Sequence, residues 1–368
     1  MNQNELLRVE ELHISLQMDK GSLPVVNGIS FGLKKGQILA LVGESGCGKS
    51  VTSLSLMRLL GKGLEISGGQ ILFRHPESGE VTDIAALGSN DKAMRKLRGD
   101  QIAMIFQEPM SSFSPLHTIG EQIMEVVRLH RKVSKLDARK RAIELLDKVG
   151  IADPAQAVDR YPHEFSGGQR QRAMIARALA CDPSVLVADE PTTALDVTIQ
   201  AQILKLLKDL QQEMGMAIIF ITHDLGLVAQ MADEVAIMYM GNVVEHGATR
   251  AIFKQPQHPY TKRLLQAIPR LGVIQGKLQS IEGSVPNLFE RPAGCAFNTR
   301  CTEQQRESCQ QRLPALRSIE QLSAPVNGTE QQVSVETSKT GNVIPNDVTP
   351  SHVIHSVACH LIHPEAVA

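Results

Sequence analysis

Hydrophobic and polar positions along this chain form blocks that predict strands and helices in alternation. Strand patterns occur within 6–42 and at 68–73, 184–189, 216–222 and 234–240, and 241–247 is typical of a hairpin. Helical spacing occurs at 50–60, repeatedly between 91 and 180, and at 198–215 and 225–233. This alternation predicts an α/β fold with a mainly parallel sheet and a mostly helical insert at about 100–180.

The pattern changes beyond residue 250. Short segments separated by prolines replace the strand–helix alternation, and 318–352 is rich in Ser, Thr, Asn, Gln and Pro. Such a composition predicts a loop or disorder for 318–352. We therefore expect one α/β domain at 1–250 and a small C-terminal extension at 251–368.

Composition narrows the possible functions. Of 368 residues, 42% are hydrophobic, so the chain can bury a sizeable core, and 38 basic against 39 acidic residues leave a net charge of −1. This balance argues against nucleic-acid binding through bulk positive charge. No apolar run approaches the roughly 20 residues of a membrane helix, and the N-terminus lacks a secretory signal, so we expect a cytoplasmic protein.

The first chemical motif is a glycine-rich turn. Residues 43–50, GESGCGKS, fit the pattern G-x-x-x-x-G-K-[ST] between a predicted strand and a predicted helix. Backbone N–H groups of such a turn surround phosphate oxygens, Lys49 reaches the β- and γ-phosphates, and the Ser50 hydroxyl binds Mg²⁺. The expected nucleotide contacts are Gly43, Glu44, Ser45, Gly46, Cys47, Gly48, Lys49, Ser50 and Val51.

A second motif places two acids at a strand end. The apolar run 185–188 leads directly into Asp189 and Glu190. Ligands bind at the carboxyl ends of parallel strands, so Asp189 is a candidate Mg²⁺ ligand. Glu190 points to the other side of the strand end and is a candidate general base for an attacking water. The two motifs together predict a P-loop NTPase.

Residues 165–172, FSGGQRQR, resemble the signature motif of ATP-binding-cassette (ABC) ATPases, with Phe165 where Leu is usual. The resemblance implies an ABC-type P-loop NTPase with a mainly parallel sheet core, an antiparallel β subdomain and a helical subdomain. It also implies a head-to-tail dimer. In that dimer each signature completes the partner's ATP site, through Ser166, Gly167, Gly168 and Gln169 here.

Other ABC elements follow in order. Gln107 resembles the Q-loop glutamine that contacts Mg²⁺ and the attacking water, and Thr193-Ala194-Leu195-Asp196 is similar to the D-loop at the dimer seam. His223 resembles the switch histidine that contacts the γ-phosphate and orients Glu190. One element departs from the family: no aromatic residue lies between Ile14 and Ile29 to stack on adenine, so we expect aliphatic contact with the base.

The extension resembles that of oligopeptide/dipeptide importer ATPases, in residues 256–265, 281–283, 285–286, 292–297, 300–301 and 357–360. This implies a subunit that hydrolyses ATP to power import of di- or oligopeptides, or related solutes, at the cytoplasmic face of the inner membrane. Implied partners are a second ABC ATPase, usually in a heterodimer, two permeases and indirectly an extracytoplasmic solute-binding protein, without nucleic acid. The alternative is a soluble ABC ATPase without a permease, acting in nucleic-acid or stress metabolism with a redox-sensing tail.

Four cysteines gather in the extension with the spacing C-x5-C-x7-C-x49-C: Cys295, Cys301, Cys309 and Cys359. This is neither the paired spacing of a zinc ribbon nor a common ferredoxin pattern, but four thiolates meet the needs of an iron–sulfur cluster. In the resembled family the quartet is linked to a [4Fe–4S] cluster, which we carry over as an expectation. Reduced cysteines in a small core, structural zinc with His360 replacing one thiolate, and disulfides stay open as alternatives.

Overall fold

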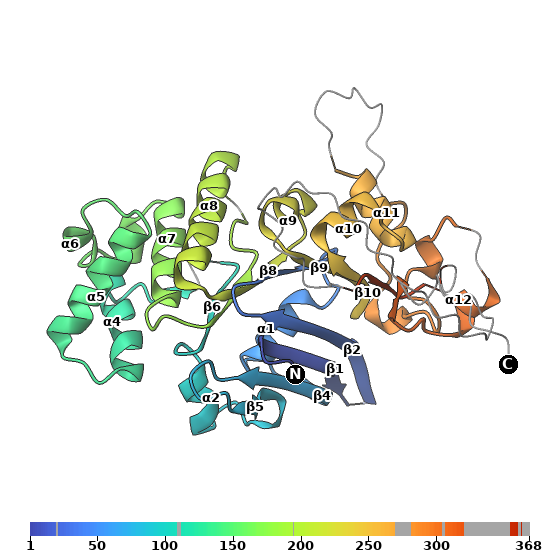
Figure 1. Ribbon diagram of the computed structural model, residues 1–368, viewed down its shortest axis with the longest axis horizontal. Coiled ribbons are helices and arrows are strands. Elements are labelled where there is room, and N and C mark those ends of the chain that lie inside the picture. Colours follow the sequence, from blue (N-terminus) through green and yellow to red (C-terminus); the bar gives the residue numbers. More distant parts are fainter. Residues whose placement is uncertain are drawn as a thin grey trace, which may run out of the picture.

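The computed structural model describes residues 1–19, 21–108, 112–193, 195–268, 281–303, 306–319, 354–359 and 362. They form a central sheet, an antiparallel sheet beside it, a group of helices at one end and the extension at the other (Figure 1). Most of 318–352, predicted to be a loop or disordered, lies outside the described residues.

The central sheet has eight strands in the order β11-β12-β10-β9-β3-β8-β7-β6. Its strands are β3 (Ile38–Val42), β6 (Ile102–Ile105), β7 (Val185–Asp189), β8 (Ala217–Thr222), β9 (Glu234–Tyr239), β10 (Asn242–Ala248), β11 (Arg317–Ser318) and β12 (Ser356–Val357). The stretch from β9 to β6 is parallel, and β10 returns antiparallel to β9. Every residue of β3, β7 and β8 is buried, as expected for strands covered on both faces. The predicted parallel α/β core is confirmed.

A second sheet has four antiparallel strands in the order β2-β1-β4-β5. Its strands are β1 (Glu5–Met18), β2 (Gly21–Lys34), β4 (Leu64–Arg74) and β5 (Val81–Asp83). One face packs on the central sheet, where Leu12 and Ile14 join a buried cluster with Leu39 and Val187. This is the antiparallel β subdomain that the resemblance implies.

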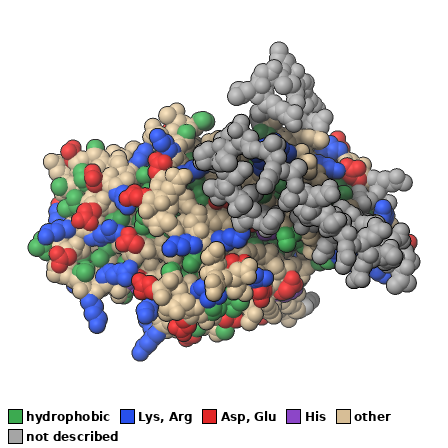
Figure 2. Space-filling model, in the orientation of Figure 1, with side chains coloured by type: hydrophobic (Ala, Val, Ile, Leu, Met, Phe, Trp, Pro, Cys, Tyr) green, Lys and Arg blue, Asp and Glu red, His purple; other side chains and the backbone are tan. Residues whose placement is uncertain are grey.

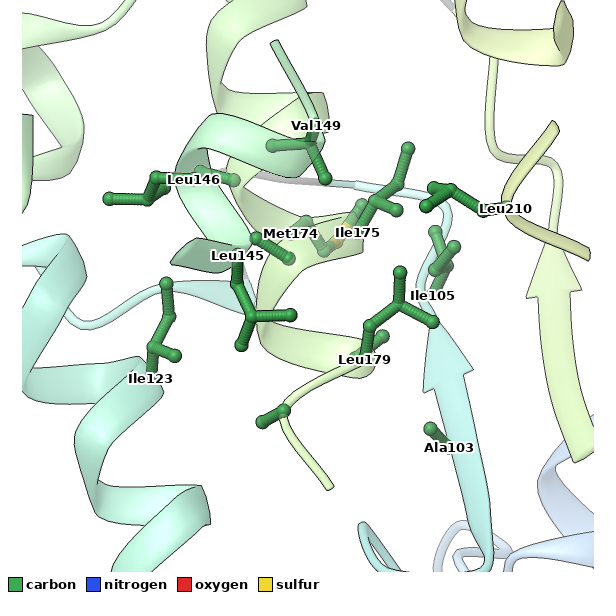
Figure 3. Packing of buried hydrophobic residues seen from close by; sticks show 14 of the residues in the cluster. Ala103, Ile105, Ile123, Leu145, Leu146, Val149, Met174, Ile175, Leu179 and Leu210 are labelled. Atoms are coloured by element: carbon green, nitrogen blue, oxygen red, sulfur yellow. The ribbon is translucent and has the colours of Figure 1, made fainter. Parts of the chain in front are cut away.

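The helical end is built from α4 (Ile119–His130), α5 (Lys135–Lys148), α6 (Pro154–Ala157) and α7 (Gly167–Ala178), with α8 (Val197–Met214) beside them. Figure 3 shows Ile123 of α4, Leu145 of α5 and Ile175 of α7 pointing into one core, which Ile105 of β6 and Leu210 of α8 complete. This shared core fixes α7 against the central sheet.

The remaining helices are α1 (Lys49–Leu56), α2 (Lys92–Leu97), α9 (Leu225–Met231), α10 (Thr249–Lys254), α11 (Pro259–Gln266), α12 (Glu307–Gln311) and the 3₁₀ turns η1 (Ile84–Ala86), η2 (Pro162–Glu164), η3 (Leu288–Glu290) and η4 (Asn298–Arg300). Among the described residues, no helix has the length and apolar character to cross a membrane.

The extension is tied to the central sheet. Its strand β12 pairs with β10 through Glu245 and Val357, and β11 continues the edge. The buried Glu245 carboxylate accepts hydrogen bonds from the backbone N–H groups of Gln257 (2.8 Å) and His258 (2.9 Å). The boundary at residue 250 stays a prediction, since the described part of the extension shares this sheet.

Candidate active site at the strand ends

The glycine-rich turn connects β3 to α1. Gly43 has no space for a side chain, because a Cβ atom there would lie 2.2 Å from the carbonyl oxygen of Met238. The Lys49 ammonium is buried and donates to the carbonyl oxygens of Gly43 (2.7 Å) and Glu44 (3.0 Å). Of the other predicted contacts, Ser45, Gly46 and Ser50 are exposed, Glu44 and Val51 half-buried, and Cys47 and Gly48 buried. The turn thus curls around its own lysine.

Asp189 ends β7 and faces α1. Its carboxylate accepts hydrogen bonds from the hydroxyls of Ser53 (3.0 Å) and Ser50 (3.4 Å). Burial raises the pKa of Asp189, although the hydrogen bonds from Ser53 and Ser50 oppose this. A carboxylate beside a hydroxyl supplies the oxygen ligands that Mg²⁺ takes together with water and nucleotide phosphates, so these residues fit that ion.

Glu190 is the centre of a hydrogen-bond network. Its carboxylate accepts from the Gln107 amide (3.0 Å) and the Thr193 hydroxyl (2.9 Å), and lies 3.0 Å from His223 Nδ1. Its φ of +44° is unusual for a residue with a side chain and turns the chain away from β7. Burial works to raise the pKa of Glu190, but hydrogen bonds from His223 and Thr193 prevail and lower it. The group is therefore a carboxylate at neutral pH.

The structure thus brings together the phosphate loop, Asp189, Glu190, Gln107 and His223. The reason lies in strand order, because these residues end or follow β3, β7, β6 and β8, which are neighbours in one parallel sheet. Gln107, predicted to contact Mg²⁺, is hydrogen-bonded to Glu190 here.

The signature residues lie apart from this network, at the start of α7. The Ser166 hydroxyl accepts from the backbone N–H of Gln169 (3.3 Å), and the Ser166 N–H donates to the Gln169 side chain (2.9 Å). Ser166 and Gly167 are exposed, and Gly168 is half-buried. Asp196 caps α8 by accepting from the Ile199 N–H (2.9 Å). Ala194, in the predicted D-loop, lies outside the described residues.

The sequence does not predict the roles of three residues at or near the site. Ser53 is one helical step of three residues after Ser50, a spacing that puts both hydroxyls on one face of α1 and toward Asp189. Thr193 was recognised only as part of the D-loop. Arg300, which binds Glu44 across 256 positions, has no local signal in the sequence.

The aliphatic residues expected to contact adenine lie beside the phosphate loop. A Cβ atom on Gly48 would be 3.3 Å from Val26 Cγ2 and 3.4 Å from the carbonyl oxygen of Val25. Met18, on the adjoining strand, is exposed. Strand β2 thus approaches the loop through the side chain of Val26 and the backbone of Val25.

The fold and the phosphate site define an ATP-binding-cassette ATPase, and the comparisons with known proteins agree. Residues 26–193 match the ABC transporter family, and residues 244–309 match the family "Oligopeptide/dipeptide transporter, C-terminal region". The chain is 50% identical over 298 residues to the dipeptide transport ATP-binding protein DppD of Bacillus subtilis (strain 168), covering 81% of this chain and 87% of that protein.

Solved structures of ABC transporter cassettes resemble this chain as well. A dimeric bacterial ABC transporter cassette superposes with a TM-score of 0.58 at 26% identity, covering 67% of this chain and 99% of the other. CbiO1 of Clostridium perfringens, part of the ABC transporter complex cbiONQ, superposes with a TM-score of 0.57 at 29% identity. The match covers 68% of this chain and 92% of the other. This chain belongs to the ABC transporter family, in the branch of oligopeptide and dipeptide transporter ATP-binding subunits, and it is an ATPase.

The expected [4Fe–4S] cluster is not supported. Within the described residues, which include all four cysteines of the extension, no group of three or more His, Cys, Asp or Glu side chains is placed to hold a metal ion. The thiols are neighbours nonetheless: burial, and then Cys359, Cys309 and Cys301, raise the pKa of Cys295 to about 12. His360, considered for zinc, lies outside the described residues.

Proposed function

We propose that this chain powers the import of di- or oligopeptides, or related small solutes, as a peripheral subunit at the cytoplasmic face of the inner membrane. The observation that carries this proposal is the match of residues 244–309 to the oligopeptide/dipeptide transporter C-terminal region, on the same chain as an ABC cassette. The similarity to a dipeptide transport ATP-binding protein extends over both parts.

ATP binding is the first step. The N–H groups of the loop and the start of α1 bind the phosphates, and Lys49 turns from the carbonyls of Gly43 and Glu44 to the β- and γ-phosphates. Mg²⁺ bound with ATP, held by Ser50 and Asp189, supplies neutralisation of the phosphate charge. Aliphatic side chains of β1 and β2 that keep exposed surface, such as Met18 and Leu23, contact the adenine.

Hydrolysis depends on Glu190. Its carboxylate accepts a proton from the attacking water, whose oxygen bonds to the γ-phosphorus as the bond to the ADP oxygen breaks. His223 and Thr193 support this role by lowering the pKa of Glu190, which keeps it able to accept a proton. The Gln107 amide, 3.0 Å from the same carboxylate, orients the base and the water.

The signature acts on a partner's nucleotide. Ser166 and Gly167 are exposed at the N-terminus of α7, where backbone N–H groups attract anions. In a head-to-tail dimer with a second ABC ATPase subunit, most simply a heterodimer, Ser166, Gly167, Gly168 and Gln169 contact the γ-phosphate in the partner's site. Asp196 lies near the same seam.

The remaining partners are two permeases, which carry the solute, and an extracytoplasmic solute-binding protein that acts through them. Nucleic acid is not among the proposed partners. In support, acidic and basic side chains are interspersed on the face of the molecule in Figure 2, and 38 basic residues balance 39 acidic ones. A nucleic-acid surface would gather one sign of charge.

Affinity purification of the tagged chain from detergent-solubilised membranes tests the proposal. Recovery of two polytopic proteins and a second ABC ATPase in stoichiometric amounts is expected. Recovery of nucleic acid without membrane proteins would contradict it and favour an ABC ATPase that works without a permease. Repeating the purification with Glu190→Gln and ATP should retain the same partners, since that substitution is expected to leave ATP binding intact.

A further inference from the structure

Arg300, in the C-terminal extension, reaches into the ATP-binding cassette. Its guanidinium donates through Nη1 to Glu44 Oε2 (2.7 Å) and through Nη2 to Glu44 Oε1 (3.2 Å). The two contacts form a bidentate ion pair with the second residue of the phosphate loop. The Arg300 side chain is only 4% exposed, and that of Glu44 is 30% exposed. This pair links the loop directly to the part of the chain beyond residue 250.

The contacts around Arg300 hold it in one orientation. Nε donates to the Glu282 carbonyl (3.1 Å), Nη2 to the Ile281 carbonyl (3.4 Å) and Nη1 to the Tyr239 hydroxyl (3.4 Å). A buried guanidinium with every nitrogen engaged has little rotational freedom. The fork that meets Glu44 is therefore preorganised by the extension and by β9.

Glu44 is also held through its backbone. Its N–H donates to the hydroxyl of Tyr260 in α11 (3.1 Å). Tyr260 packs in an aromatic cluster with Tyr239 and Phe297, at ring-centroid distances of 4.7 and 5.3 Å. The extension thus fixes both the main chain and the side chain of Glu44.

Two consequences for ATP follow. The Glu44 carbonyl is one of the two that hold Lys49, so fixing Glu44 fixes the place of the phosphate-binding ammonium. In addition, Arg300 neutralises a carboxylate on the second residue of the phosphate loop, whose charge would otherwise oppose binding of the triphosphate. Burial works to lower the pKa of Arg300, but Glu44 and Tyr239 prevail and raise it, so the neutralising charge is permanent.

We propose that Arg300 is a positioning residue for nucleotide binding, through which the C-terminal extension sets the affinity of the phosphate loop for ATP. It does not touch the nucleotide. It acts through Glu44 by balancing the charge and fixing the loop. ATP hydrolysis does not chemically require an extension, and this contact gives the extension a direct influence on the ATP site.

The test is a double-mutant cycle on ATP affinity, measured by equilibrium dialysis of labelled ATP against the full-length chain. Arg300→Met is expected to raise the Kd for ATP about tenfold, because it leaves Glu44 uncompensated beside the phosphates. In the Glu44→Gln background, the same Arg300→Met substitution is expected to change the Kd less than about twofold, since the repelling charge is gone.

A matched control is Arg263→Met. Arg263 is also in the extension, but it donates to the Thr302 hydroxyl (2.7 Å) at an exposed position. It is expected to leave the Kd unchanged. Thermal unfolding of each variant separates loss of fold from loss of affinity, since a purely structural role for Arg300 lowers stability in both Glu44 backgrounds alike.

Two results would overturn the proposal: a Kd that Arg300→Met does not change, or an equal rise in both Glu44 backgrounds. If Arg300→Met does not fold, Arg300→Gln decides, because it keeps a side chain that can donate hydrogen bonds and loses the charge that balances Glu44. A rise of about threefold that disappears with Glu44→Gln supports the proposal. No rise, or the same rise in both backgrounds, rejects it.

Discussion

At the strand ends, Glu190 keeps its negative charge although its side chain is only 12% exposed. In the extension, half-buried Cys295 is kept as the neutral thiol, because burial raises its pKa to about 12. Both groups are removed from water, which disfavours the charged form of each. The difference lies in their neighbours: Glu190 receives hydrogen bonds from Gln107, Thr193 and His223, whereas Cys295 faces other cysteines.

Burial alone therefore does not decide whether a side chain is reactive. Donors aimed at Glu190 maintain a base at the place where ATP is expected, whereas burial raises the pKa of the Cys295 and Cys301 thiols in the extension. We read the first region as the chemical centre and the second as packing that supports Arg300 and its neighbours. The following experiments test this contrast.

Glu190→Gln is expected to have the largest effect. Removing the base should lower kcat for ATP by about 10²- to 10⁴-fold, while the Kd for ATP stays close to that of the unaltered chain. Steady-state hydrolysis and equilibrium binding measure the two quantities. Glu213→Gln, at an exposed pair with Lys148, is the matched control. Turnover near normal in Glu190→Gln would assign the base to another residue.

Lys49→Ala should weaken nucleotide binding. A hydrogen bond to a charged group contributes about 1.5–3 kcal/mol, so the Kd for ATP should rise roughly tenfold to a hundredfold. Equilibrium dialysis measures the change. Lys148→Ala, which removes a surface ammonium 2.9 Å from Glu213, should leave the Kd unchanged. Retained affinity in Lys49→Ala would mean that the loop does not bind the phosphates as proposed.

His223→Ala should shift the pH dependence of hydrolysis. Glu190 works as the carboxylate, so activity is present above its pKa and is lost as pH falls through that pKa. His223 helps to lower the pKa of Glu190, and removing it should move the acid limb of the kcat profile to higher pH. A pH–rate profile measures this. An unmoved acid limb, with only a uniform loss of rate, would contradict the role given to His223.

Cys295 should show the smallest functional effect. With a pKa of about 12, it carries almost no thiolate at pH 7 and should react with iodoacetamide far more slowly than an ordinary thiol. Mass spectrometry of tryptic peptides follows the modification, with the denatured chain as the control that reacts readily. Rapid alkylation of the folded chain at pH 7 would remove the contrast with Glu190.

The sequence indicates which residues meet at the candidate ATP site, because the site lies at the ends of parallel strands. Residues 43–50, Asp189, Glu190 and His223 each follow a short apolar run, and parallel neighbours bring such ends to one edge. The sequence does not indicate which strands are neighbours. The order β3-β8-β7-β6, in which β8 lies between the strand before the phosphate loop and the strand that ends at Asp189, comes from packing.

The extension was predicted less well for a physical reason. The Glu44–Arg300 pair joins positions 256 apart, and β12 adds to the central sheet from beyond a long intervening segment. No hydrophobic period or turn signal encodes such long-range pairing. The family resemblance likewise implied a cluster at the four cysteines, but the positions of the thiols depend on loops whose paths the sequence does not specify.

Whether this chain powers peptide import can be measured in proteoliposomes that contain it together with its permeases and partner ATPase. The quantity measured is the uptake of labelled di-, tri- and tetrapeptides. The complex should accumulate peptide only when ATP is on the side of this chain and solute-binding protein is on the other. The complex that carries Glu190→Gln should bind ATP and accumulate almost none. Equal accumulation by the two complexes, or accumulation without ATP, would contradict the account.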